Sequence, residues 1–332
     1  MPPETLTHAP APAKQLPRFR RARPQDRPAF RLTDRDRDLL KIIYDYRFIT
    51  AEMLQDLAPA VPLTERQQEA LAKLRQLIKE RKALAPRTDT EERPQRTKRE
   101  ILRRLQVLYH AGFVQRKKLS DRDPIVYSLG NMGHDELTLF HGIDRQQINW
   151  TTKNREAGEN YIRHTLMVSR FRHAVALALR DIPGVTVAWE PYFKAKVQYE
   201  DTLRGKTQLV DGVVIPDGLF VVTDRGKSIH YFLEADRSTM TNARYLTKLK
   251  NYFAFYATSV RDNQTPVQRM RVLTLTLSEE RKKNLRLTAQ AVHETMAKEL
   301  FWFACERSYL GLPEQVVGPI WQTLKDENLQ HW

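Results

Sequence analysis

The residues of this sequence that are best suited to chemistry are acids near the ends of two expected strands. Asp217 follows Pro216 on one strand, and Glu234 and Asp236 end the next. Strand alternation puts Glu234 and Asp236 on one face, and a neighbouring hairpin strand can bring Asp217 beside them. Three crowded carboxylates repel one another strongly unless a divalent metal neutralises them. Their hard oxygen ligands suit Mg²⁺ or Mn²⁺, which activate water and stabilise a phosphoryl transition state.

The same acids also have a structural interpretation. Asp217 and Gly218 together are typical of a turn, and ion-pair networks gather acids as catalytic sites do. Nearby cations that could pair with the other two acids are Arg237, Arg244 and Lys248. We expect His164 and His173 to be packing or surface residues rather than metal ligands. The residues alone leave the catalytic and the structural interpretations open.

A second set of residues is suited to binding. Residues 96–122 contain nine Lys and Arg and two acids, a net charge of +7 in 27 positions. Basic side chains on a helix that fits the major groove can contact bases, and those on an adjacent hairpin can reach flanking phosphates. The candidate DNA-binding residues are Arg96, Lys98, Arg99, Arg103, Arg104, Arg116, Lys117 and Lys118. The alternative is a solvated helix face with ordinary surface charges.

The elements that must position these cations indicate a winged helix-turn-helix over residues 30–130. Thr33 and Asp36 have the spacing of a capping box at the start of a first helix. Thr50 caps a short second helix that follows after a short turn. This order of two helices is how a helix-turn-helix begins.

The third helix and a hairpin complete the expected winged domain. The helix runs from about Arg96 to His110, and Gly112 supplies the left-handed residue that ends it. Two alternating stretches, 113–119 and 125–129, predict short strands, with a turn at 120–124 between them. That hairpin is the expected wing.

Two further stretches flank this domain, and one is inserted in it. Residues 1–29 are Pro-rich and increasingly basic, so we expect a disordered basic tail. Residues 58–95 depart from the simple pattern and predict a helical insertion, with a charged helix over 64–84. Residues 131–158 are expected to form a linker that includes one short helix.

Residues 159–332 predict an α/β domain with a mixed sheet flanked by helices, so the whole chain is of the α+β or α/β class. Expected helices cover 161–179, 242–256 and 278–298. Expected strands cover 185–189, 193–199, 212–222, 228–234 and 272–277. The apolar run 300–305 suits either a strand or a helix.

The overall composition favours a polyanionic partner. The net charge is +15, and residues 1–130 hold 28 Lys and Arg against 17 acids. Such an excess attracts duplex DNA, the densest common polyanion.

Cys305 is the only cysteine, which excludes an internal disulfide and a Cys-based zinc site. The sequence has no apolar run of about 18 residues, so we expect a cytoplasmic protein with no membrane partner and no organic cofactor.

The acids also follow a distinctive order of elements. The stretches Ile215-Pro-Asp217 and Phe232-Leu-Glu-Ala-Asp236 lie on adjacent expected strands after a leading helix. This arrangement resembles the PD-(D/E)XK nuclease superfamily. The resemblance implies a restriction-endonuclease-like core of helix, three strands, helix and strand.

The same resemblance assigns roles to individual residues. It implies that Asp217 and Glu234 are catalytic acids that bind the metal, with Glu159 as an additional metal-binding acid. The lysine of the pattern falls at Asp236 here, which departs from the family. Some members take the lysine from the following helix, so the resemblance points to Lys248, with Lys250 as the other lysine available.

Several short motifs extend over most of the chain. They are Leu32-Thr-Asp-Arg-Asp-Arg-Asp-Leu-Leu40, Arg103-Arg-Leu-x-x-Leu-Tyr-x-Ala-Gly112, His164-Thr-Leu166, Pro216-Asp217, Phe232-Leu-Glu-Ala-Asp-Arg237 and Lys248-Leu-x-x-Tyr252. In this order they resemble the replication-relaxation family of plasmid and mobile-element proteins. The resemblance implies a DNA-binding winged helix and a role in plasmid replication or DNA relaxation.

Three hypotheses for the function follow. The first is a double-stranded DNA-binding protein for plasmid or mobile-element replication or relaxation, with a homodimer or replication and mobilisation proteins as further partners. The second is an active Mg²⁺-dependent endonuclease. The third is a winged-helix transcriptional regulator with a C-terminal oligomerisation domain, which predicts half-sites spaced by about one helical turn of DNA.

Overall fold

The computed structural model describes eight segments of the chain, and the chain divides into two compact units. The described residues are 21, 31–58, 97–143, 154–203, 206–262, 269–290, 297–326 and 328–331. The first unit comprises Met1–Tyr44 and Thr50–Glu156, and the second comprises Asp45–Ile49 and Ala157–Trp332. The expected basic tail, apart from Arg21, and the expected insertion, apart from Ala58, lie outside the described residues.

The first unit begins with two capped helices. Helix α1 covers Asp34–Tyr46, and the Thr33 backbone N–H donates to Asp36 Oδ2 at 2.7 Å. Helix α2 covers Ala51–Leu57, and the Thr50 hydroxyl accepts from the backbone N–H of Met53. Both caps satisfy N–H groups that have no partner inside the helix, which confirms the expected starts.

Helix α4, Lys98–Ala111, is capped at both ends. Thr97 and Glu100 form a reciprocal capping box, so the helix begins slightly later than the expected Arg96. Gly112 ends it in the left-handed region, with φ 92°. The buried stripe of Ile101, Leu105 and Leu108 faces the core, as their spacing predicts.

An antiparallel hairpin follows α4. Strands β2 (Val114–Lys117) and β3 (Val126–Leu129) pair from Val114 opposite Leu129 to Lys117 opposite Val126. With the short strand β1 (Ile49–Thr50) they make a three-stranded sheet in the order β1-β3-β2. Helix α5 (Asn131–His141) comes next, in the segment expected to be a linker.

The second unit contains a mixed six-stranded sheet in the order β11-β10-β9-β8-β7-β4. The strands are β4 (Val185–Glu190), β7 (Gly218–Asp224), β8 (Lys227–Asp236), β9 (Met270–Thr276), β10 (Phe301–Cys305) and β11 (Gln322–Thr323). Strands β8, β9 and β10 are parallel, and the other neighbours pair antiparallel. The expected mixed sheet is therefore present.

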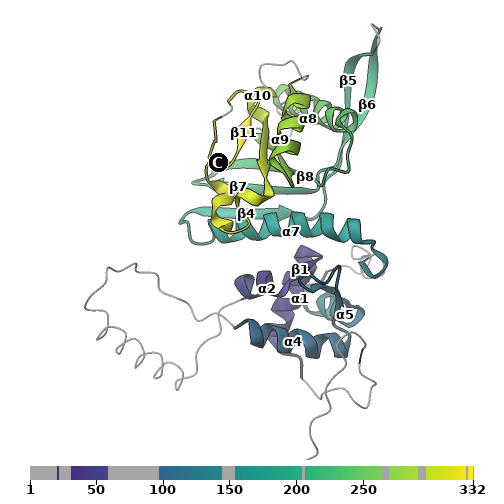
Figure 1. Cartoon of the computed structure of the whole chain (residues 1–332), viewed down its shortest axis with the longest axis vertical. Helices are drawn as coiled ribbons and strands as arrows, with labels where there is room; N and C mark the ends of the chain where they lie inside the picture. The colour runs from purple at the N-terminus through teal and green to yellow at the C-terminus, as the bar shows by residue number, and fades with distance from the viewer. Residues whose placement is uncertain are drawn as a thin grey trace, which may run out of the picture. The chain divides into compact units, whose positions relative to one another are not determined.

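Helices cover both faces of this sheet. Helix α7 (Glu159–Leu179) packs on one face, where Phe171 meets Phe220 and Leu233 in one apolar cluster. Helices α8 (Asn242–Asp262) and α9 (Glu279–Ala289) pack on the other face, in a second cluster around Phe232. Figure 1 shows α7 on one side of the sheet and α8 and α9 on the other.

Two expected elements of this unit were wrong. The expected strand 212–222 is two strands, β6 (Lys206–Val214) and β7, separated at Pro216, which has no N–H for a sheet ladder. Strand β6 instead pairs with β5 (Ala195–Leu203) in a separate hairpin that extends past α8 in Figure 1. The helix expected to reach about residue 298 ends at Ala289.

The last part of the chain adds short elements. The apolar run 300–305 is strand β10, preceded by the short helix α10 (Ala297–Leu300). Two 3-10 turns, η2 (Glu306–Ser308) and η3 (Pro313–Val317), lead to β11. In the described part of the chain, no helix combines the length and the apolar character needed to cross a membrane.

Candidate functional site

Helix α4 presents one exposed face with basic and apolar side chains. Arg99 and Arg103 are exposed and lie four residues apart, so they share a face of the helix. Leu102 lies between them and is 39% exposed, although it is a large apolar residue. This face combines positive charge with an apolar group, which suits contact with phosphates and base edges.

Two other candidate cations of α4 have partners within the first unit. Lys98 forms an ion pair with Glu52 at 2.5 Å. Arg104 contacts both carboxylate oxygens of Asp36 and donates to the backbone oxygen of Arg31 at 2.9 Å. Asp36 is buried, which acts to raise its pKa, but hydrogen bonds from Arg104 and Thr33 leave that pKa below its ordinary value. Arg104 therefore joins α4 to the start of α1.

The candidate cations of the hairpin differ in their surroundings. The guanidinium of Arg116 lies 4.3 Å from the centre of the Tyr109 ring, a cation–π contact. Lys117 is exposed, and Lys118 forms an ion pair with Asp121 at 2.5 Å. Arg96 lies outside the described residues.

The acid site of the second unit is built around Asp217, just before β7. Its backbone N–H donates to Leu233, and its Oδ2 accepts from the backbone N–H of Ala235, each at 2.9 Å. His164 of α7 donates from Nε2 to Asp217 Oδ1 at 3.1 Å. Asp217 is thus held by β8 on one side and by α7 on the other.

Glu234 is the buried member of the site. It lies near the end of β8, and its side chain is 3% exposed. Lys248 of α8 contacts Glu234 Oε2, and the Tyr252 hydroxyl donates to Oε1 at 2.6 Å. Lys248 and Tyr252 are four residues apart, so one face of α8 supplies both groups. The structure therefore brings Glu234 and Lys248 together.

The surroundings shift the pKa values of three of these groups. Burial and the nearby charge of Asp217 raise the pKa of Glu234 to about 7. The hydrogen bond to Asp217 raises the pKa of His164. Burial acts to raise the pKa of Asp217, but His164 and Lys248 outweigh it and leave this pKa lowered. A carboxyl group with a pKa near neutrality is suited to proton transfer, and it also occurs in buried ion-pair networks.

The oxygen atoms of the two acids do not fit a divalent metal site as they stand. Each oxygen of Asp217 and Glu234 already has a protein partner, and His164 and Lys248 supply positive charge beside them. Among the described residues, no group of three or more His, Cys, Asp and Glu side chains is placed to hold a metal ion.

The remaining candidates of the acid site have partners of their own. Glu159 forms an ion pair with Arg163 at 2.7 Å, and its side chain is 56% exposed. Lys250 of α8 pairs with Asp201 of the β5–β6 hairpin at 2.6 Å. At the position of the motif lysine, Asp236 is buried and pairs with Arg281 of α9 at 2.6 Å. That pair joins the end of β8 to α9.

Two residues of the site were not expected from the sequence. His164 was expected to be a packing or surface residue, and Tyr252 was named as the end of the Lys248-Leu-x-x-Tyr252 motif. Tyr252 packs in the core, and its hydroxyl also reaches Glu234. Its position four residues after Lys248 is the sequence signal that could have placed it at the site.

The comparisons with known proteins identify a family. Residues 82–268, more than half of the chain, match a family model described as replication-relaxation. No curated protein and no solved structure matches the chain.

Proposed function

The chain belongs to the replication-relaxation family, and we propose that it is a double-stranded DNA-binding protein that acts in the replication or relaxation of a plasmid or other mobile element. The family name supports the process, and the net charge of +15 supports the polyanionic partner. We propose that the first unit makes the contact with DNA.

The first unit suits a winged helix-turn-helix. Its elements α1, α2, α4 and the β2–β3 hairpin follow the order of that fold, with α4 as the recognition helix and the hairpin as the wing. The capping at both ends of α4 holds the helix at a fixed length, and its buried stripe fixes which face is outward.

The observation that carries the proposal is the exposed pair Arg99 and Arg103 on one face of α4. Arginine donates two parallel hydrogen bonds to guanine or to phosphate, and it stays charged at all relevant pH values. The neighbouring Leu102 offers an apolar contact of the kind that thymine methyl groups accept.

The test is charge reversal on this face. The double variant Arg99→Glu with Arg103→Glu is compared with wild type in fluorescence anisotropy with duplex DNA over a range of salt concentrations. We expect weaker binding and a salt dependence whose slope is smaller by about 0.9 for each DNA phosphate that the variant no longer neutralises.

A control pair separates this effect from a general loss of positive charge. Arg225 and Lys283 are exposed cations of the second unit, and reversing both makes the same change in net charge. Affinity and slope should then stay near wild type. If the α4 variant folds and binds DNA as wild type does, α4 is not the recognition helix.

We further propose that the second unit has a PD-(D/E)XK-like core. The order α7, β4, β7, β8, α8, β9 supports it, with the β5–β6 hairpin as an insertion. The placement of Asp217 before β7, Glu234 on β8 and Lys248 on the next helix also supports it.

Within this core, the partners of the acids favour a DNA-binding scaffold whose charges are balanced by ion pairs. The second candidate function is a Mg²⁺- or Mn²⁺-dependent endonuclease that uses Asp217, Glu234 and Glu159. One observation favours it: Lys248 reaches Glu234, as the catalytic lysine of such an enzyme would.

One experiment decides between the two candidates. Supercoiled and linear DNA are incubated with the protein, with and without Mg²⁺ or Mn²⁺, beside Asp217→Ala and Glu234→Ala. The scaffold predicts binding without cleavage in either metal. Metal-dependent nicking that both substitutions abolish would establish the endonuclease, and Lys248→Gln should then abolish it while Lys250→Gln, altered in the same way on the same helix, does not.

A further inference from the structure

A pocket lies at the end of the sheet that is remote from Glu234. It has a volume of about 680 Å³, and Ile229, Met270 and Arg271 line it at the start of β8 and β9. Glu234 lies further along β8, opposite Thr274 of β9, whereas His230 near the start of β8 pairs with Met270. The volume is within the range of pockets that hold small ligands. The pocket is therefore separate from the acid site.

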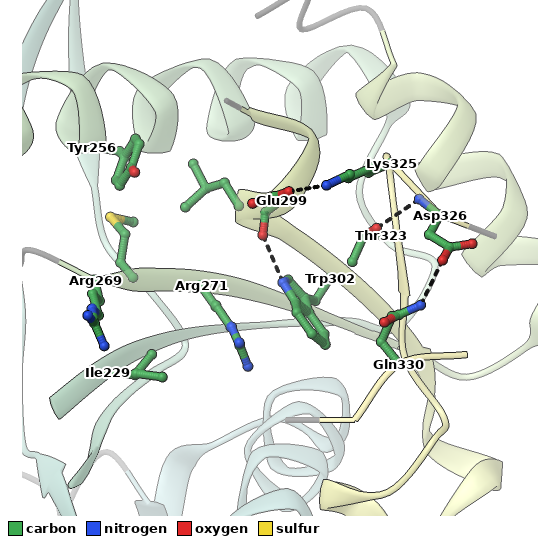
Figure 2. Close-up of a pocket in the computed structure, with 12 residues that line it drawn as sticks. Ile229, Tyr256, Arg269, Arg271, Glu299, Trp302, Thr323, Lys325, Asp326 and Gln330 are labelled. Carbon is green, nitrogen blue, oxygen red and sulfur yellow. Dashed lines mark hydrogen bonds and ion pairs between the residues drawn. The ribbon is translucent and has the colours of Figure 1, made fainter. Parts of the chain in front are cut away.

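Two arginines at the start of β9 give the pocket its positive charge. Arg269 and Arg271 are two residues apart, so strand alternation directs both to the same side, as Figure 2 shows. Arg269 is exposed, and in the described part of the chain neither arginine forms an ion pair with a carboxylate. Their charge is available to a ligand.

Arg271 is held in place by aromatic residues. Its guanidinium lies 4.3 Å from the centre of the Trp302 ring, and one of its nitrogens donates to the Tyr231 hydroxyl at 3.4 Å. Trp302 is itself fixed, because its indole N–H donates to the backbone oxygen of Glu299 at 2.9 Å. A guanidinium stacked in this way loses little further freedom when it binds a planar or tetrahedral anion.

The acids of the pocket are already engaged. Glu299 forms an ion pair with Lys325 at 2.5 Å. Asp326 accepts from the side chain of Gln330 at 3.0 Å and from the backbone N–H of Asn328 at 2.8 Å. Figure 2 shows these pairs on the side of the pocket opposite Arg269. They leave the arginine side of the pocket positive.

We propose that this pocket binds the phosphate of a nucleotide. Arg269 and Arg271 hold the phosphate by charge-assisted, forked hydrogen bonds. The base packs against the apolar part of the lining on the face of the sheet that carries Arg271, which includes Ile229. A free mononucleotide and the terminal nucleotide of a DNA strand share this chemistry.

The test is calorimetric titration of the full-length chain. The probes are the common deoxynucleoside 5′-monophosphates, inorganic phosphate, short oligothymidylates with and without a 5′-phosphate, and a glutamate-rich peptide. The variants are Arg269→Gln with Arg271→Gln, Arg269→Gln alone, and the control pair Lys283→Gln with Arg307→Gln, which makes the same charge change as the double variant at exposed sites near the other end of the sheet. Arg269 is exposed, so its single variant tests the pocket even if loss of the Trp302 contact unfolds the double variant.

We expect wild type to bind a mononucleotide or the 5′-phosphorylated oligothymidylate. The double variant should bind about tenfold more weakly or worse, the single variant should lose part of the affinity, and the control pair should match wild type. Preference for the mononucleotide indicates a free nucleotide, and preference for the phosphorylated oligothymidylate indicates a strand end. Both support the proposal.

Three outcomes would overturn it. They are no binding of any nucleotide probe by wild type, equal affinity for inorganic phosphate or the peptide, and unchanged binding in the folded Arg269 variant. The variant Arg99→Glu with Arg103→Glu should leave nucleotide binding intact. Failure of duplex recognition by α4 is therefore distinguishable from failure of this pocket.

Discussion

Helices α4 and α8 both carry cationic side chains, but they use them in opposite ways. On α4, Arg99 and Arg103 are exposed on one face. On α8, Lys248 contacts the buried Glu234, and Lys250 pairs with Asp201. The charge of an exposed cation can attract a polyanion in solution, whereas the charge of a lysine beside a buried acid is neutralised within the fold.

The number of basic residues on a helix therefore does not identify a DNA-binding face. Arg104 is on the same helix as Arg99, yet it contacts the buried Asp36 and joins two helices. The position of the nearest acid decides the role of each cation. Substitutions on both helices can test that rule.

The largest effect is expected at the ion pair of α8. Glu234→Ala removes the acceptor of both Lys248 and Tyr252, and it leaves a mostly buried ammonium without its ion-pair partner. Breaking a buried pair on one side should lower the free energy of unfolding by about 3 kcal/mol. Urea denaturation followed by circular dichroism measures this loss.

Two further variants test whether burial causes this loss. Asp201→Ala breaks the other pair of α8, whose acid side chain is 18% exposed against 3% for Glu234, so a smaller loss of about 1 kcal/mol is expected. Glu234→Leu combined with Lys248→Met replaces both charges by apolar groups and should recover most of the stability. Equal losses in the Glu234 and Asp201 variants would show that burial does not distinguish the two pairs.

A smaller effect is expected at the two kinds of arginine on α4. Arg104→Ala leaves the carboxylate of Asp36 buried without its guanidinium partner, and a loss of about 2 kcal/mol in unfolding free energy follows. Arg99→Ala, at an exposed site on the same helix, should change stability by less than about 0.5 kcal/mol. If Arg104→Ala weakens DNA binding but leaves stability unchanged, its assignment as an internal contact is wrong.

The sequence predicted the local features of the fold well, because they depend on neighbours in the chain. Thr33, Thr50 and Gly112 each mark a helix end by chemistry that acts within one turn. The hairpin after α4 also follows from alternation and turn residues. Pro216 was the missed signal, since a residue without an N–H ends a central strand and here separates two strands.

The candidate site was less predictable, because its contacts join residues far apart in the sequence. Asp217, Glu234 and Lys248 could be named from their order, but the choice of Lys248 over Lys250 depends on how α8 packs on the sheet. Arg281, which pairs with Asp236, is 45 positions away and was not among the expected partners. Sequence spacing gives no distance between such residues, so only the packed structure shows which charges meet.

The smallest effect is a dependence of stability on pH that belongs to the acid site and not to α4. The folded-state pKa of Glu234 is raised from 4.5 to about 7, and that of His164 is raised above 6.5. Between the unfolded and the folded pKa of each group, the folded protein binds more protons than the unfolded chain. Stability therefore falls as pH rises through that interval. From about pH 6 to about pH 8, Glu234 alone contributes a loss of about 1 kcal/mol. The lowered pKa of Asp217 acts only below about pH 4, outside this range.

Glu234→Gln should flatten the curve of unfolding free energy against pH, whereas Arg99→Gln should leave its slope unchanged. A slope that survives Glu234→Gln would assign the titration to groups elsewhere, and a slope that disappears in Arg99→Gln would contradict the contrast between the two helices.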